Sequence, residues 1–122
     1  DPRIVEMFRA EAEARQVRQR TLTPEEIADR LLLRLANEGA FVLEDGIAMR
    51  ASDIDTIYLN GYGFPAWRGG PMWQIEEQGL AKVAERIRGY EKAHGKRWAL
   101  APLIARLAAS GGKFADAAKG AR

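Results

Sequence analysis

With 122 residues, 47% of them hydrophobic, and three tryptophans, the chain can fold around a core of its own and is not typical of a disordered segment. Its formal net charge of only +2 does not favour a dedicated nucleic-acid-binding protein. The lack of cysteine excludes disulfides, thiolate catalysis and cysteine-based zinc sites, and it fits a cytoplasmic location. No apolar run approaches the roughly 18 residues of a membrane span, and no signal peptide is visible.

The first two predicted helices differ in how strongly the sequence marks them. The residues after Pro2 predict a helix over about residues 3–17, with Ile4 and Phe8 on a narrow apolar stripe. A second helix begins after Thr23, where Thr23 and Glu26 form a capping-box pattern around Pro24 at the first helical position. We expect this helix to run over residues 24–45.

The second predicted helix has an unusually wide apolar face. Its apolar positions are Ile27, Leu31, Leu32, Leu35, Ala36, Phe41, Val42, Leu43 and, just beyond, Ile47. We expect Arg30, Arg34, Asn37, Glu38 and Asp45 to supply its polar side. Gly39 inside this helix predicts a close contact with another helix, and Gly46 is placed to end it.

Residues 52–55, Ser-Asp-Ile-Asp, predict the start of a third helix. Ser52 is the expected N-cap, and both aspartates fall in the first turn, where the helix dipole favours negative charge. A metal site is disfavoured because no further carboxylate or histidine lies nearby to complete the ligands. Residues 56–59 alone could form a strand, but the cap and the spacing of Ile54, Ile57 and Tyr58 favour a helix with these three side chains inward.

Residues 60–72 break the helical pattern with four glycines, two prolines, three aromatics and one arginine. Glycine allows positive φ, and proline cannot sit comfortably inside a helix. A flexible linker would not carry Tyr62, Phe64 and Trp67, so we expect an ordered and buried corner around which the helices pack.

The second half predicts shorter helices over residues 71–78, 80–93 and 102–109, with Phe114 as a last apolar anchor and residues 115–122 frayed. The predicted fold class is therefore all-α, a small helical bundle of about five to six helices.

No self-contained active site emerges from these motifs. The pattern Gly61-x-Gly63-x-x-Ala66 formally matches a dinucleotide fingerprint, but the prolines and glycines that follow leave no long helix to hold a pyrophosphate. His94, the only histidine, lies beside Gly95, where a helix-terminal dipole partner is the expected role. We therefore expect no catalytic residue, no cofactor-binding residue and no metal ligand in this chain.

Arg68 is the one charged residue of the corner and leaves two alternatives. Its planar fork suits a phosphate or carboxylate ligand. The slightly favoured alternative is that it binds backbone carbonyls or an acidic side chain and so holds the loop.

Taken together, these motifs resemble the C-terminal domain of 3-hydroxyacyl-CoA dehydrogenases, and most of all its second, last copy in the multifunctional fatty acid oxidation complex α-subunit. The residues that carry the resemblance are Arg30-Leu31-Leu32, Asn37-Glu38-Gly39-Ala40, Glu44-Asp45-Gly46-Ile47-Ala48, Ser52-Asp53-Ile54-Asp55, Asn60-Gly61-Tyr62-Gly63-Phe64-Pro65, Arg68-Gly69-Gly70-Pro71-Met72 and Gly79-Leu80. The resemblance covers nearly all of residues 1–116, which we expect to form the domain, with residues 117–122 as a flexible tail.

The resemblance implies a fold similar to the C-terminal domain of 6-phosphogluconate dehydrogenase. It also implies that NAD and the catalytic histidine and glutamate belong to a separate domain of the parent enzyme. In the first copy an Asn before Arg-Leu-Leu lies near the substrate, whereas the matching residue here is Asp29, which supports the second-copy interpretation. The candidate substrate-proximal or loop-building residues are Gly61, Tyr62, Gly63, Phe64, Pro65, Arg68, Gly69 and Gly70.

Two functional hypotheses follow. In the first, the chain is a packing domain, not catalytic alone, of a fatty acid β-oxidation enzyme with enoyl-CoA hydratase and NAD-dependent 3-hydroxyacyl-CoA dehydrogenase activities. Its partner would be the preceding helical domain of the same polypeptide, with self-association as a further possibility for the separate piece. In the second, it is an acyl-CoA-binding module that uses Arg68 and the basic helix over residues 82–92.

Overall fold

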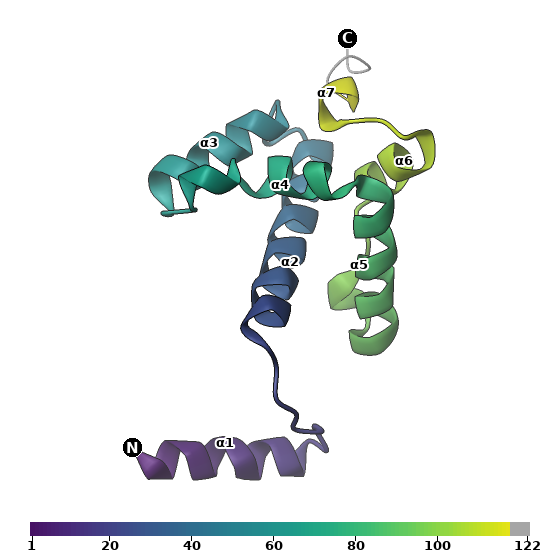
Figure 1. The fold of residues 1–122 in the computed structure, drawn as a ribbon. Helices are drawn as coiled ribbons and strands as arrows, with labels where there is room; N and C mark the ends of the chain where they lie inside the picture. Colours follow the sequence, from purple (N-terminus) through teal and green to yellow (C-terminus); the bar gives the residue numbers. More distant parts are fainter. Residues whose placement is uncertain (118–122) are drawn as a thin grey trace.

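The computed structural model describes residues 1–117, and every regular element in that range is helical (Figure 1). The predicted all-α class is confirmed. The elements are α1 (Pro2–Ala14), α2 (Pro24–Glu44), α3 (Ala51–Gly61), the 3-10 turn η1 (Ala66–Arg68), α4 (Pro71–Gln78), α5 (Leu80–His94), the 3-10 turn η2 (Lys96–Trp98), α6 (Pro102–Ser110) and α7 (Phe114–Ala117). The tail predicted for residues 117–122 lies, apart from Ala117, outside the described residues.

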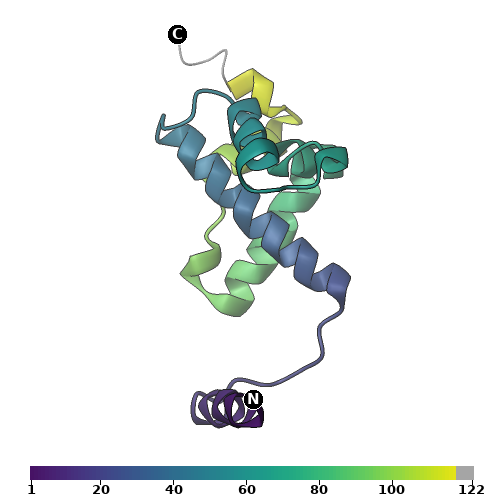
Figure 2. The same ribbon diagram turned by 90° about the vertical axis from the view of Figure 1, so that its left-hand side faces the viewer.

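Helix α2 is the centre of the packed body. In Figure 1 α5 descends next to the rising α2, and Figure 2 shows that the two helices cross steeply; α3 and α4 cross the C-terminal half of α2. The helical side chains with no exposed surface come from α2, α4, α5 and α6 and pack into one core. The largest are Leu33, Met72, Ile75, Val83, Ile87 and Ile104. Phe114 is buried as well, which confirms it as the last apolar anchor.

The start of α2 confirms half of the predicted capping box. The Thr23 Oγ1 accepts a hydrogen bond from the backbone N–H of Glu26 at 3.1 Å. The Glu26 side chain does not return to the Thr23 amide; its carboxylate instead binds the guanidinium of Arg20. Glu26 binds the Arg20 guanidinium in preference to the Thr23 amide because a charge-assisted bidentate pair is stronger than a hydrogen bond to a neutral amide.

Gly39 confirms the predicted close helix contact. A Cβ atom at this position would lie 2.6 Å from the Met72 Sδ of α4 and 3.5 Å from the Cδ1 of Ile54 in α3. The missing side chain therefore lets α3 and α4 cross the C-terminal half of α2 at close range.

Asn37 corrects the prediction that it belongs to the polar side of α2. Its side chain is fully buried, donating from Nδ2 to the Ala99 carbonyl at 2.8 Å and accepting at Oδ1 from the Ala101 N–H at 2.9 Å. One amide thus satisfies two backbone groups of the segment between η2 and α6, which a buried chain segment requires.

Helix α1 lies apart from this body. It ends at Ala14, earlier than the predicted residue 17, because Gln16 adopts a positive φ of 54°. In two views at right angles α1 stands beyond the N-terminal end of α2, joined to it by residues 15–23 (Figure 2). None of its residues is buried. None of the described helices is both long enough and apolar enough to span a bilayer.

Candidate functional site

The corner between α3 and α4 is ordered by its backbone and by one buried carboxylate. Gly63, Gly69 and Gly70 adopt positive φ values of 68°, 73° and 102°. Asp55 reaches from α3 to the first turn of α4, where its Oδ1 accepts from the Met72 N–H at 2.7 Å and its Oδ2 from the Trp73 N–H at 3.1 Å. Helix α4 begins after a glycine, which offers no side-chain cap, so Asp55 acts as its cap from another helix.

The observed capping of α3 differs from the prediction as well. The structure places the N-cap at Arg50, with Ser52 inside the helix, and Asp53 accepts from the Arg50 backbone N–H at 3.1 Å. Asp53 therefore stabilises its own helix as expected, whereas Asp55 serves α4. Burial raises the pKa of the Asp55 carboxyl, the hydrogen bonds from Met72 and Trp73 lower it in part, and the nearby Glu76 raises it further.

The eight candidate residues lie together on this corner, but the prediction that its aromatics are buried is wrong. Tyr62 is 73% exposed and Trp67 79% exposed, while Phe64 is half-buried. The backbone bonds and the Asp55 cap supply the order that we had attributed to buried aromatics. The Arg68 guanidinium lies over the Trp67 ring at 4.5 Å from its centroid, an arrangement that neither predicted role of Arg68 included.

The glycine pattern of this corner does not fit a dinucleotide. Gly61 ends helix α3 rather than following a strand, and Ala66 begins a 3-10 turn of three residues. A pyrophosphate needs a strand before the glycines and a long helix after them. No NAD site is therefore assigned to these residues.

Helix α2 also carries apolar side chains on its outer side, next to the exposed and ion-paired Arg34 and Glu38, and this side continues onto α3. On the outer side Leu31 is 67% exposed and Ile27 is exposed, with the half-buried Leu35 one turn further along. Leu35 lines a groove of about 290 Å³ together with Ile57 of α3 and Tyr62, the residue that follows α3. We call Ile27, Leu31, Leu35, Ile57 and Tyr62 the α2–α3 face. Ile57 was predicted to point inward and is instead 56% exposed, while Ile54 is buried as expected.

Asp29, the residue at the position of the first copy's Asn, is held in an ion pair. Its carboxylate binds the guanidinium of Arg86 on α5, and Arg86 also donates to the Gln78 Oε1 at 3.0 Å. The position thus links α2 to α5. The same contact occupies one of the cations of the basic helix over residues 82–92.

Arg30 and His94 join the N-terminal end of α2 to the C-terminal end of α5. His94 lies in the last turn of α5, where its expected role as a dipole partner places it. Arg30 Nη2 lies 3.1 Å from His94 Nε2, and its guanidinium covers the Tyr90 ring at 5.2 Å. Tyr90 in turn packs against Trp98 with a centroid distance of 4.5 Å. This cluster closes the end of the body and is a structural contact.

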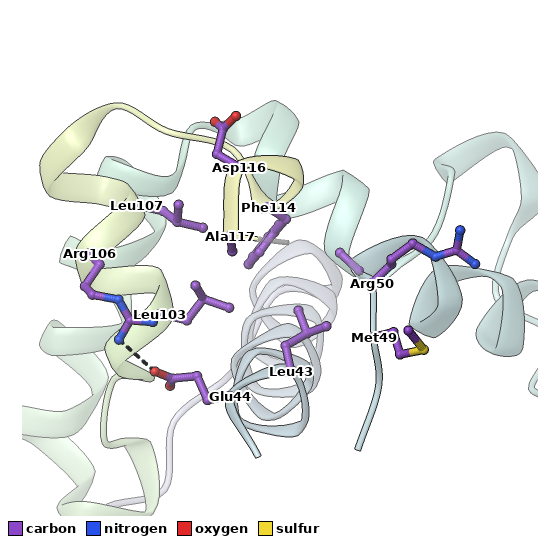
Figure 3. A pocket seen from close by; sticks show the side chains of 11 residues that line it. Leu43, Glu44, Met49, Arg50, Leu103, Arg106, Leu107, Phe114, Asp116 and Ala117 are labelled. Atoms are coloured by element: carbon purple, nitrogen blue, oxygen red, sulfur yellow. Dashed lines mark hydrogen bonds and ion pairs between the residues drawn. The ribbon is translucent and has the colours of Figure 1, made fainter. Parts of the chain in front are cut away.

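A larger pocket of about 520 Å³ opens between the C-terminal end of α2, α6 and α7 (Figure 3). Leu103, Leu107 and Phe114 form its apolar floor. Both arginines at its rim have acidic partners: Arg106 binds Glu44 at 2.9 Å and Arg50 binds Asp53 at 2.9 Å. Within residues 1–117 no group of three histidine, cysteine or carboxylate side chains could hold a metal.

Comparison with known proteins decides the family. The profile of the family described as 3-hydroxyacyl-CoA dehydrogenase, C-terminal domain, matches residues 27–121. The chain belongs to this family. Helix α1 and the linker after it lie outside the matched range of the 3-hydroxyacyl-CoA dehydrogenase C-terminal domain.

Individual relatives agree with this assignment. The chain is 44% identical over 93 residues to the peroxisomal bifunctional enzyme of Danio rerio, covering 76% of this chain and 13% of that protein. It is 36% identical over 90 residues to the peroxisomal bifunctional enzyme of Homo sapiens, covering 74% and 12%. It is 38% identical over 97 residues to the fatty acid oxidation complex subunit alpha of Acinetobacter baumannii (strain SDF), covering 79% and 13%. The chain thus spans only about an eighth of the length of these relatives.

Proposed function

We propose that this chain is the C-terminal packing domain of a multifunctional fatty acid β-oxidation enzyme, equivalent to the second copy of the helical domain, and that it is not catalytic alone. In the parent, enoyl-CoA hydratase and NAD-dependent 3-hydroxyacyl-CoA dehydrogenase activities, together with the NAD and acyl-CoA sites, would belong to other domains. The relatives that support this are the bifunctional enzymes and complex subunits named above. A cytoplasmic location stays a prediction, since the names of some relatives include the word peroxisomal.

The observation that carries the proposal is that α2 has apolar side chains on two sides, and its own domain buries only one of them. Leu33, Ala36 and Ala40 have no exposed surface on its inner side, yet Ile27 and Leu31 are exposed on the outer side. Exposed apolar side chains that gather on one side of a domain mark a surface for another protein or domain. The α2–α3 face also carries Tyr62, a residue type enriched in the energetic centres of interfaces. We therefore assign the preceding helical domain of the parent polypeptide as the partner of this face.

The Asp29–Arg86 ion pair supports the non-catalytic part of the proposal. A carboxylate neutralised by Arg86 and shared with helix packing is a poor substitute for an uncharged Asn beside a substrate. The same pair weighs against the acyl-CoA-binding hypothesis, because Arg86 is already engaged and Arg68 stacks on Trp67. Calorimetry with an acyl-CoA and the 122-residue chain separates the hypotheses: we expect no heat of binding.

The packing role is tested by mixing this chain with the separately expressed preceding helical domain of the parent. We expect calorimetric binding that Leu31→Glu weakens at least tenfold, because an ionised carboxylate would be buried in an apolar contact. Ala81→Glu is the matched control, an equally acidic change at an exposed position of α5. Equal binding by both variants, or no binding by the unmodified chain, would overturn the assignment of this face.

A further inference from the structure

The corner between α3 and α4 gathers the exposed aromatic side chains of the packed body. Tyr62, Trp67 and Trp73 are exposed, whereas every other phenylalanine, tyrosine and tryptophan of residues 24–117 is at least partly buried. Figure 1 shows this corner at one edge of the body, on the opposite side of α2 from α5. Tryptophan, tyrosine and arginine are the residue types that dominate the binding energy of interfaces, so this edge has the composition of a contact surface.

Arg68 is the cation of this corner, and no carboxylate within residues 1–117 forms an ion pair with it. Eight other arginines of that range each bind a carboxylate. The partly buried Arg68 side chain instead places its guanidinium over the Trp67 ring. The ring attracts the positive charge but does not accept the guanidinium hydrogen bonds as a carboxylate would. The planar fork of Arg68 is therefore left for an acceptor on another surface.

The backbone holds the Trp67–Arg68 pair in place in the free chain. The Arg68 N–H donates to the Pro65 carbonyl at 2.9 Å. Gly69 then turns the chain at a φ of 73°, and a Cβ atom there would lie 2.6 Å from the Cε3 of the Trp73 ring. A guanidinium that is already held by a turn and a ring loses less conformational entropy on binding, so more of the interaction free energy appears as affinity.

The chemistry of this corner favours one kind of ligand. The planar fork of an arginine matches the two oxygens of a carboxylate. The exposed rings of Tyr62 and Trp67 need apolar surface around that carboxylate. A protein surface supplies both, whereas the phosphates of a CoA would leave the two rings uncovered.

We infer that the Trp67–Arg68 pair is a second anchor of this domain and binds an aspartate or glutamate side chain that the preceding helical domain presents from an apolar surface. The inference rests on the proposed function, because the partner is the same and Tyr62 belongs both to the α2–α3 face and to this corner. It adds a charge-dependent contact to the apolar side chains of that face. An ion pair of defined geometry fixes how the two domains are oriented.

Titration of this chain with the preceding helical domain tests the anchor separately from the α2–α3 face. We expect Arg68→Met to weaken binding at least tenfold, and Arg68→Lys to weaken it less, because lysine keeps the charge but lacks the planar fork. Arg88→Met is the matched control at an exposed position of α5 that also has no ion pair within residues 1–117, and it should bind as the unmodified chain does. Salt screens ion pairs, so the difference between the unmodified chain and Arg68→Met should shrink as the salt concentration rises.

The outcomes of this titration separate the anchor from the proposed function. If Leu31→Glu weakens binding and Arg68→Met does not, the anchor is overturned and the packing role stands. A loss in Arg68→Met that does not change with salt would overturn the carboxylate ligand, because the contact would then be apolar. No binding by the unmodified chain would overturn both proposals.

Hydroxyl-radical labelling of the intact parent polypeptide gives a second test that needs no separated domain. We expect Trp67 to be oxidised several-fold more slowly in the parent than in the 122-residue chain, because the partner surface covers its ring. Slower oxidation of Leu31 in the parent with no change at Trp67 would contradict the anchor and leave the α2–α3 face as the contact.

Discussion

The Asp55 carboxylate and the Met72 backbone N–H, 17 positions apart in the sequence, form a buried hydrogen bond of 2.7 Å that fixes where α4 starts relative to α3. Replacing Asp55 with Ala removes the acceptor for two N–H groups of α4. Because these groups are at least partly shielded from water, we expect the free energy of unfolding to fall by about 2–3 kcal/mol. Urea unfolding measures this, with the exposed Ser52→Ala on the same helix as a control that stays within about 0.5 kcal/mol. A loss no larger than that of the control would show that the cap contributes little.

The raised pKa of Asp55 gives its contribution a defined pH dependence. The folded protein holds this proton more tightly than the unfolded chain, so this stabilising contribution is fully present below about pH 4 and is lost as the pH rises through the raised folded pKa. Asp55→Asn cannot titrate, so the difference in unfolding free energy between the unmodified chain and this variant should shrink as the pH rises above about 4. Urea unfolding at several pH values measures the difference, and an increase over that range would contradict a raised pKa.

Gly70 and Gly63 differ in the space around them and in backbone conformation, with φ values of 102° and 68°. Both have positive φ, but a Cβ at Gly70 would overlap the Asp55 side chain, whereas nothing lies within 4 Å of a Cβ at Gly63. Gly63→Ala should cost only the backbone term, about 1–2 kcal/mol. Gly70→Ala should cost about 3 kcal/mol or more, because its backbone at φ 102° and ψ 163° suits essentially glycine alone and because the clash displaces the cap. Thermal unfolding of the two variants side by side makes the comparison, and equal losses would argue against the close approach.

Asn37 should be among the least replaceable polar residues of the body. Asn37→Leu keeps the approximate volume but leaves the Ala99 carbonyl and the Ala101 N–H without partners, which we expect to cost about 2–4 kcal/mol. Glu38→Gln, at the neighbouring exposed position, should change stability by less than about 0.5 kcal/mol. Hydrogen exchange at the Ala101 amide gives a local readout: fast exchange is expected in Asn37→Leu, and retained protection would mean that another group accepts this bond.

The helices could be predicted from the sequence wherever the signal is local. Pro71 and Gly79 bracket α4 as expected, and Thr23 caps α2, because these effects act within a few residues. The predictions failed where a side chain serves a distant segment. Asp55 looks like a first-turn residue of its own helix until the fold brings Met72 beside it. A signal was available, since a helix that starts after glycines needs an acceptor from elsewhere.

The surface was harder to predict than the core, for a physical reason. Spacing shows that Ile27, Leu31 and Ile57 are apolar, but it does not distinguish a side chain buried within one domain from one that awaits a partner. The same limit explains Tyr62 and Trp67, whose exposure follows from a corner held by backbone geometry. Asp29 was singled out by family resemblance alone, and only the fold shows that Arg86 neutralises it.

The three tryptophans give the protein an internal set of optical reporters. Trp98 is buried and packed against Tyr90, Trp73 at the start of α4 is 49% exposed, and Trp67 stands in solvent beneath the Arg68 guanidinium. Fluorescence from Trp98 should therefore be blue-shifted and resistant to iodide, while that of Trp67 should be red-shifted and readily quenched. With Trp73 replaced by Phe, the emission of Trp98 reports loss of the core and the emission of Trp67 reports rearrangement of the corner. One unfolding experiment can then follow both events at two wavelengths.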